Sequence, residues 1–172
     1  MGRFLVFLVL GVLATGLGYL AQQSLIGRPA AVLPEPLLVD LGGGAHHLAE
    51  FRGKVLVLNF WATWCQPCRS EMKTFSDLQV RLGGRGVQFI GIALDDPSTV
   101  KAYLRDFPVT YPIWVGGADI PAWADSLGND LSALPFTVVF DPNGEKQQVK
   151  VGIYEEGPLL KVIESLLSLI HI

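Results

Sequence analysis

The sequence has 172 residues, enough for one domain of ordinary size with a hydrophobic core of its own. Half of the residues are hydrophobic, which is high for a soluble domain, so part of the chain is expected to lie in a membrane. The net charge is −3, and the lysines and arginines form no block. The chain therefore lacks the basic patch with which proteins bind nucleic acids, and no nucleic-acid partner is expected.

The N-terminal segment holds much of this hydrophobic excess. Phe4 to Ala21 reads FLVFLVLGVLATGLGYLA without a charge, and a run of about 18 apolar residues is just long enough to span a bilayer. A buried core helix is disfavoured because the run has no polar face. Tyr19 is too large for a position close before a cleavage site. Residues 1–22 are therefore predicted to be an uncleaved membrane anchor, with a cleaved signal as the alternative. Both place the remaining chain outside the cytoplasm.

A linker with three prolines, residues 23–36, separates this segment from a folded domain predicted at residues 37–172. The domain is expected to open with a β-hairpin. Its first strand is the apolar run 37–41, which ends in the glycine turn 42–44, and residues 46–48 are predicted to form the return strand.

The rest of the domain alternates strands with helices. Val55–Trp61 and Val87–Leu94 have almost no polar break, which is typical of strands buried on both faces. Apolar residues at helical spacing predict a helix from Cys68 to Leu82. The remaining expected segments are helix 98–107, extended piece 111–115, helix 120–127, strand 136–140, turn 141–144, antiparallel strand 147–153 and amphipathic helix 159–170. This order predicts an α/β fold with a mixed central sheet flanked by helices.

The two cysteines of the chain, Cys65 and Cys68, stand where the first buried strand gives way to a helix. The first helical turn exposes unpaired N–H groups and a partial positive charge, which stabilise a thiolate. Pro67 fits this turn because its missing N–H is not needed there. Cys65 is therefore predicted to be the exposed nucleophile. Cys68, one turn later, is predicted to point inward as the resolving thiol.

Two other roles for the cysteine pair remain open. A structural disulfide is compatible with an exported domain, although so small a loop restricts the unfolded chain little. A metal site needs about four ligands, and the nearby candidates are His46 and His47, whose side chains would point to opposite faces of a strand. The strand, Cys-x-x-Cys, helix context favours a redox pair.

Several motifs in the same order resemble the membrane-anchored, thioredoxin-like thiol-disulfide oxidoreductases of the TlpA/ResA type. The stretch WATWCQPCRSEM is similar to their active site. LVDLGGGAHHLAEFRGKVLVLNFWATWC resembles their opening hairpin and first central strand, and VQFIGIALDD and ALPFTVVFDPNGE resemble later strands. The resemblance runs from about Leu37 to the C-terminus. It implies a thioredoxin-like fold with an N-terminal hairpin extension and an N-terminal transmembrane helix.

The resemblance also implies a substrate-binding surface around the cysteines. Trp64, Gln66 and Pro67 would contact the substrate. Leu134 and Pro135 would be joined by a cis peptide bond that faces the cysteines, and their backbone would pair with a substrate strand. Apart from the resemblance, an ordinary trans proline at the start of a strand is the better interpretation, since few X-Pro bonds are cis.

An acidic residue is expected near the cysteines. Asp95 ends a buried strand, where a partly desolvated carboxylate could take a proton from Cys68 during exchange. The neighbouring Asp96 could be this acid instead, and a helix-capping aspartate is the alternative for Asp95. General thioredoxins carry a buried acid in the preceding strand, but Asn59 stands at that position here and cannot act as a base.

The activity that the resemblance implies is the reduction of disulfides in exported proteins by a dithiol–disulfide cycle of Cys65 and Cys68, without a bound cofactor. Apocytochrome c, during cytochrome c maturation, is one such substrate. A membrane electron donor would regenerate the dithiol. The protein is expected to be a monomer with a single span in the cytoplasmic membrane and its catalytic domain on the periplasmic or extracytoplasmic side.

Three other functions would use the same residues. An oxidant that forms disulfides differs in the direction of electron flow. A copper-binding module would need the two thiols and a histidine, but His46, His47 and His171 are not near an obvious ligand position. A peroxidase would have to work with the pair Cys65 and Cys68 alone, because the chain has no third cysteine.

Overall fold

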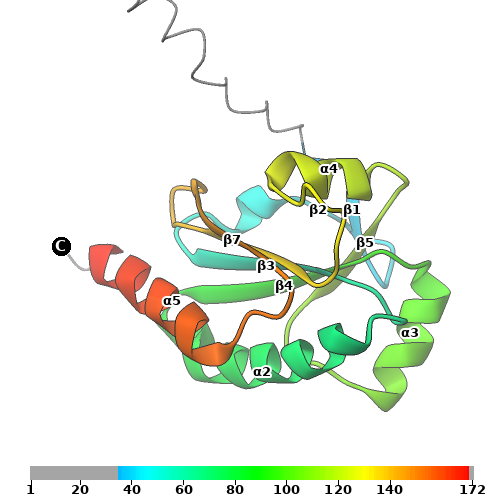
Figure 1. Cartoon of the computed structure of the whole chain (residues 1–172), viewed down its shortest axis with the longest axis horizontal. Coiled ribbons are helices and arrows are strands. Elements are labelled where there is room, and N and C mark those ends of the chain that lie inside the picture. The colour runs from blue at the N-terminus through cyan, green and yellow to red at the C-terminus, as the bar shows by residue number, and fades with distance from the viewer. Residues whose placement is uncertain (1–34, 171–172) are drawn as a thin grey trace, which may run out of the picture. The chain divides into compact units, whose positions relative to one another are not determined.

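The computed structural model describes residues 35–170. The predicted anchor, residues 1–22, and nearly all of the linker lie outside this part of the chain. The described residues form a seven-stranded sheet with helices on both faces (Figure 1). This is the mixed α/β arrangement that the order of the segments predicts. Within residues 35–170, the structure contains no helix of the length and apolarity that a membrane span requires.

The sheet has the strand order β2-β1-β5-β4-β3-β6-β7. Strands β3, β4 and β5 run parallel to one another, whereas β1, β2, β6 and β7 each pair antiparallel with their neighbours. The strands are β1 (Leu38–Asp40), β2 (Ala45–His46), β3 (Val55–Trp61), β4 (Val87–Ala93), β5 (Ile113–Gly116), β6 (Phe136–Phe140) and β7 (Lys146–Val151). The strand that leads to the cysteines, β3, therefore lies inside the sheet, between β4 and β6.

The four α-helices of residues 35–170 are α2 (Gln66–Leu82), α3 (Pro97–Asp106), α4 (Ile120–Leu127) and α5 (Glu156–Ile170). In Figure 1, α2, α3 and α5 lie on one side of the sheet and α4 lies on the other. The alternation of side chains along β3 explains why both sides are apolar. Val55, Val57 and Trp61 join the core under α2 and α5, and the intervening residues, such as Leu58 and Phe60, join the core under α4.

The register of the sheet brings three chain segments together at one end of its central strands. Trp61, the last residue of β3, is paired with Ala93, the last residue of parallel β4. Phe136, the first residue of antiparallel β6, is paired with Phe60. The loops that leave β3 and β4 and the segment that enters β6 therefore meet at this end of the strands. Ligands bind to open α/β sheets at the carboxyl ends of their parallel strands, so this is where a site is expected.

The predicted opening hairpin is correct in position but not in its return strand. The sequence predicts an extended segment at 46–48, but β2 ends at His46 and Leu48–Phe51 forms a 3₁₀-helix, η1. The Glu50 carboxylate accepts the His47 N–H at 2.7 Å, and the Glu35 carboxylate accepts the Leu48 N–H at 2.8 Å. These side chains satisfy backbone donors that a longer strand would have used in the ladder. The C-terminal helix also begins at Glu156, three residues earlier than predicted.

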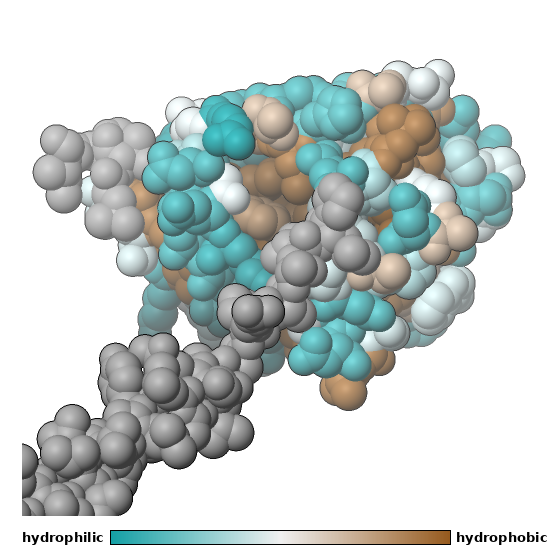
Figure 2. Space-filling view, turned by 90° about the horizontal axis from the view of Figure 1, so that it is seen from above, coloured by the Kyte–Doolittle hydropathy of each residue, from teal (hydrophilic) through white to brown (hydrophobic). Residues whose placement is uncertain are grey.

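The surface combines hydrophilic residues with a few exposed apolar side chains. Viewed from above in Figure 2, hydrophilic residues cover much of the described surface, and hydrophobic residues show between them in groups. Trp64 is 68% exposed although it is large and apolar. Phe107, at the end of α3, is 51% exposed. Trp64 directly precedes Cys65 in the sequence, so a large apolar side chain is exposed next to the cysteine pair.

Candidate active site

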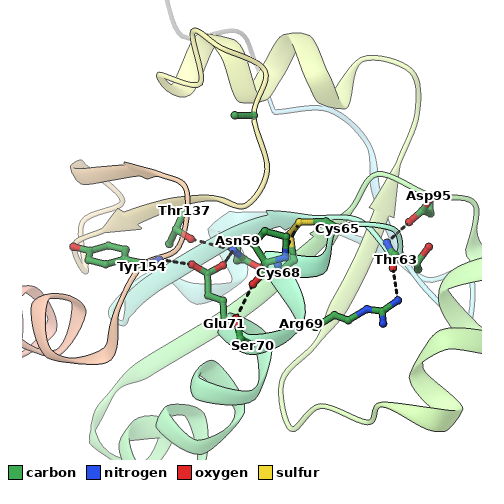
Figure 3. Close-up of a disulfide and its surroundings, with 12 residues drawn as sticks. Asn59, Thr63, Cys65, Cys68, Arg69, Ser70, Glu71, Asp95, Thr137 and Tyr154 are labelled. Carbon is green, nitrogen blue, oxygen red and sulfur yellow. Dashed lines mark hydrogen bonds between the residues drawn. A yellow bond between two sulfur atoms is a disulfide. The ribbon is translucent and has the colours of Figure 1, made fainter.

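The cysteines lie at the junction of β3 and α2, as predicted. Cys65 is the N-cap of α2 and forms a disulfide bond with Cys68 (Figure 3). The Cys68 N–H donates a hydrogen bond to the Cys65 sulfur at 3.3 Å. Cys65 is 4% exposed and Cys68 is fully buried. Cys65 is therefore the more accessible of the two, but it is not the openly exposed residue that the sequence suggested, because most of its surface is covered in the disulfide form.

The residues expected to bind substrate surround this disulfide. Trp64, Gln66 and Pro67 are all exposed on the loop and first turn around Cys65. The Leu134–Pro135 peptide bond is cis, which confirms the geometry that the family resemblance implied. The buried Pro135 directly precedes β6, and its carbonyl accepts the Gly152 N–H at 2.8 Å. The cis peptide and the cysteine loop thus lie next to each other at the same end of β6 and β3, because these two strands are paired.

A buried carboxylate that the sequence analysis missed lies one helical turn after Cys68. Glu71 is 2% exposed, and its two oxygens accept hydrogen bonds of 2.7 Å from the Asn59 side-chain amide and from the Tyr154 backbone N–H (Figure 3). Asn59 also donates to the Thr137 hydroxyl at 3.0 Å. Burial raises the pKa of Glu71 to about 7, although both hydrogen bonds to the carboxylate act to lower it. Glu71 can therefore exchange a proton near neutral pH.

The position of Glu71 in the helical pattern was the signal that could have revealed it. Apolar positions on the buried face of α2 include Cys68, Met72 and Phe75. Glu71 is three residues after Cys68 and four before Phe75, so it must lie on the same face. A carboxylate at such a position is either paired or functional. Asn59 is its partner from β3, which explains how an amide can stand where general thioredoxins have an acid.

The two neighbouring aspartates have separate contacts. The Asp95 carboxylate accepts the backbone N–H of Thr63 at 2.6 Å, in the loop just before Cys65. Asp96 is the N-cap of α3 and accepts the backbone N–H groups of Ser98 and Thr99, both at 3.0 Å. The hydroxyl groups of Ser98 and Thr99 also donate to this carboxylate, and they, with the backbone N–H groups, hold the pKa of Asp96 well below its usual range. Helix capping is therefore the role of Asp96, and Asp95 is the aspartate beside the cysteine loop.

The two histidines within residues 35–170, His46 and His47, do not lie beside the cysteines. His46 lies on β2, and three strands of the sheet separate β2 from β3. Its two ring nitrogens lie 3.1 Å from carboxylate oxygens of Asp40 and Glu50, and these hydrogen bonds raise the pKa of His46. The ring also stacks on Trp114, with 4.7 Å between centroids. His171 lies outside the described residues. Among residues 35–170, no group of three His, Cys, Asp or Glu side chains could hold a metal ion.

The sequence matches a known family over most of its length. The profile of the AhpC/TSA family matches residues 28–156. A protein of Geobacillus kaustophilus (strain HTA426), thiol-disulfide oxidoreductase ResA, is 31% identical over 164 residues, which cover 92% of each chain. ResA of Bacillus subtilis (strain 168) is 27% identical over 155 residues, covering 87% of this chain and 84% of that protein. The family match includes both cysteines and the residues around them.

Solved structures agree with this assignment. A thioredoxin-related protein from Neisseria meningitidis serogroup B is 34% identical, with a TM-score of 0.65, and the alignment covers 78% of this chain and 98% of that one. A putative thiol:disulfide interchange protein DsbE from Chlorobium tepidum has the same fold at 22% identity, with a TM-score of 0.68 over 81% of this chain and 98% of that one. The fold is thus thioredoxin-like, and the chain belongs to the AhpC/TSA family as a thiol-disulfide oxidoreductase of the ResA type.

Proposed function

We propose that this protein reduces disulfide bonds in exported polypeptides by cycling Cys65 and Cys68 between a dithiol and a disulfide. The observation that carries the proposal is the Cys65–Cys68 bond at the start of α2, where the Cys68 N–H points at the Cys65 sulfur. In the reduced protein the same N–H and the helix N-terminus would stabilise a thiolate on Cys65. A thiolate is the form that attacks disulfides.

The exchange proceeds in two steps. The Cys65 thiolate attacks one sulfur of the substrate disulfide, so that a Cys65–substrate bond forms, the substrate bond breaks, and the second substrate sulfur leaves as a thiolate that takes up a proton. Cys68, as a thiolate, then attacks the Cys65 sulfur and releases the first substrate thiol. The first substrate sulfur also leaves as a thiolate and takes up a proton from solvent. Two electrons have then passed from the cysteine pair to the substrate. No bound cofactor is needed for these steps.

The second step requires that Cys68 lose its proton inside the protein. Cys68 is fully buried, so its proton needs an internal acceptor. We assign this role to Glu71, because it lies one turn away on the same helix face and its pKa is raised to about 7. The role predicted for Asp95 stays a prediction. Its carboxylate accepts the Thr63 N–H, in the loop just before Cys65.

Substrate recognition is assigned to the surface around Cys65. Trp64, Gln66 and Pro67 are exposed there and would meet the polypeptide on either side of the target disulfide. The segment at Leu134 and Pro135 lies next to this loop, just before β6, and its backbone would pair with an extended polypeptide, as the family resemblance implies. Such recognition suits an unfolded or extended substrate, and apocytochrome c, with its pair of cysteines, is a substrate of this kind.

The predicted location gives the reaction its context. With residues 1–22 as a membrane anchor, the domain would face the periplasm or another extracytoplasmic space, as a monomer. The tether would raise the effective concentration of the domain for partners in the same membrane. One of these partners must supply electrons, because each turnover leaves the cysteines oxidised. In intact cells, a membrane-impermeant maleimide should label the reduced protein, and labelling only after lysis would contradict this location.

The direction of electron flow is tested by the reduction potential of the full chain in mild detergent. The protein is equilibrated in dithiothreitol or glutathione buffers, and free thiols are trapped and separated on a gel. A potential near that of thioredoxin, about −270 mV, is expected for a reductase. A potential near about −120 mV would mean an oxidant that makes disulfides, and the proposed direction would be wrong. A Cys68→Ser variant, which cannot close the disulfide, is the control for the gel shift.

A further inference from the structure

The loop between β3 and Cys65 is held by hydrogen bonds to both sides of one residue, Thr63. Its backbone N–H donates to the Asp95 carboxylate at 2.6 Å, and its carbonyl accepts from the Arg69 guanidinium at 3.3 Å (Figure 3). The N–H belongs to the peptide plane before the Thr63 Cα, and the carbonyl to the plane after it. The two contacts therefore fix two successive peptide planes, and with them both backbone dihedrals of Thr63.

The fold explains why these two side chains reach Thr63. β3 and β4 pair in parallel with Trp61 opposite Ala93, and the Leu94 N–H donates to the Trp61 carbonyl at 2.9 Å. If this register is continued by two residues, Asp95 lies opposite Thr63. The Asp95 carboxylate then accepts the Thr63 N–H just beyond the last backbone hydrogen bond between β3 and β4. Arg69 comes four residues after the N-cap of α2. Side chains in a helix lean toward its N-terminus, which directs Arg69 back to the cysteine loop.

Arg69 does not depend on Thr63 alone for its position. Its guanidinium carbon lies 5.5 Å from the centre of the Tyr103 ring and 5.6 Å from that of the Phe107 ring. The two rings stack on each other with 4.9 Å between centroids. A guanidinium over aromatic faces is held by cation–π attraction. This contact gives the half-exposed Phe107 a function, because the C-terminal end of α3 supports the arginine that holds the loop.

We propose that Arg69 and Asp95 are positioning residues for the thiol exchange, and we call the pair of contacts the Thr63 clamp. The clamp fixes the peptide that leads directly into Trp64 and Cys65. It would keep the nucleophilic sulfur over the helix N-terminus, and Trp64 on the surface beside it, in the dithiol and the disulfide forms alike. This inference rests on the proposed function, since it gives Cys65 the role of nucleophile.

The clamp also places two opposite charges at Thr63, two residues before Cys65. The guanidinium of Arg69 favours a thiolate on Cys65, and the carboxylate of Asp95 disfavours it. Loss of either side chain should release the loop, but the two losses should change the ionisation of Cys65 in opposite directions. If the two side chains served only the general stability of the fold, their losses would not change the ionisation of Cys65 in opposite directions. The effect of loop position and the effect of charge can therefore be measured separately.

The experiment uses the reduced full chain in mild detergent with the variants Arg69→Met, Arg69→Lys, Asp95→Ala and Asp95→Asn. Lys73→Met is the matched control, because Lys73 lies one turn further along α2 and makes an exposed ion pair with Asp77. The placement of the Cys65 sulfur is measured by the second-order rate constant of its reaction with a short peptide whose cysteine carries a thionitrobenzoate disulfide. Charge is read from the pH profile of Cys65 alkylation by iodoacetamide, in a Cys68→Ala background, because this small reagent needs no positioning.

Arg69→Met and Asp95→Ala should each slow the peptide reaction about tenfold, since small misplacements of a reacting group have effects of this order or larger. Arg69→Lys should recover part of the rate, and Asp95→Asn should lose less than Asp95→Ala because its amide oxygen can still accept the Thr63 N–H. The midpoint of the alkylation profile should move to higher pH in Arg69→Met and to lower pH in Asp95→Asn, each by roughly a few tenths of a pH unit, because water screens the effect of a single nearby charge.

The clamp would be refuted if Arg69→Met and Asp95→Ala matched Lys73→Met in the rate with the peptide. It would also be refuted if Arg69→Met and Asp95→Asn shifted the alkylation profile in the same direction. Failure of the proposed function looks different, because the wild-type protein would then react with the peptide no faster than a small free thiol does. In that case the opposite shifts in alkylation of Cys65 would still test whether Arg69 and Asp95 act on this sulfur.

Discussion

The buried carboxylate of Glu71 should make the stability of this protein depend on pH in a defined direction. Its pKa is about 7 in the folded chain, against 4.5 for an ordinary glutamate, because burial disfavours the charged form. A group whose pKa is raised by folding stabilises the native state fully below its unfolded pKa, and this stabilisation is lost as pH rises through the folded value. The difference in pKa corresponds to about 3 kcal/mol, lost between about pH 4.5 and pH 7.

The variant Glu71→Gln isolates this contribution because glutamine fits the same hydrogen-bonding site. The Asn59 amide oxygen is buried and has no partner among the described residues. If the Asn59 amide turns over, its oxygen can accept from the side-chain amide of the introduced glutamine and from the Thr137 hydroxyl, and the glutamine oxygen can still accept the Tyr154 N–H. The Glu71→Gln variant should therefore fold, and it should lack the change in stability with pH that the Glu71 carboxyl causes.

The measurement is guanidinium unfolding of the oxidised full chain, followed by tryptophan fluorescence between about pH 4.5 and about pH 8. The free energy of unfolding of the wild type minus that of Glu71→Gln should fall by about 3 kcal/mol over this range. Taking the difference cancels the titration of other groups, His46 among them. Asp77→Asn, which changes an exposed acid on the same helix, is the control and should track the wild type. Parallel stability curves for Glu71→Gln and wild type would refute the reasoning.

Three other variants test the cysteine cycle, the histidine and the core. Cys68→Ser should accumulate a mixed disulfide between Cys65 and a peptide substrate, seen as an added mass that dithiothreitol removes; release of product at the wild-type rate would contradict the two-step cycle. His46→Gln should lower stability more at about pH 5.5 than at about pH 8, because the raised pKa of His46 stabilises the fold only while the ring is protonated; denaturant midpoints that shift equally would exclude this. Phe75→Ala should cost about 3–5 kcal/mol in denaturant unfolding, while Val80→Ala, at an exposed position of the same helix, should cost less than about 0.5 kcal/mol.

The strands and helices near the cysteines could be predicted because their patterns reflect burial directly. Val55–Trp61 is apolar on both faces of the sheet and is β3 without a change of bounds. The helix that follows has apolar residues at one face and a proline in its first turn. The 3₁₀-helix at Leu48–Phe51 could not be predicted in the same way. It depends on hydrogen bonds to the Glu35 and Glu50 side chains, and such contacts leave no periodic signal in the sequence.

The site was predicted less completely than the fold. Cys65 and Cys68 are identified by their spacing and by the strand before them. The helical spacing places Glu71 on the buried face of α2, but its partners, the Asn59 side chain and the Tyr154 backbone 83 positions further along the chain, meet it only in the assembled fold. The sequence could not separate Asp95 from Asp96 either, since adjacent residues with the same side chain differ only in direction. In the structure, one contacts the cysteine loop and the other caps α3.

The place of β6 in the sheet has a consequence for the order in which the protein can be assembled. β3 lies between β4 and β6, but β6 comes late in the sequence, and Phe60 must wait for Phe136 as its partner. A chain that emerges with its N-terminus first presents both cysteines before the strand that completes their side of the sheet exists. During that interval the thiols are open to oxidation and to unintended partners. Pairing across so long a stretch of chain is also slow, so the cysteines stay uncovered on that side until β6 arrives.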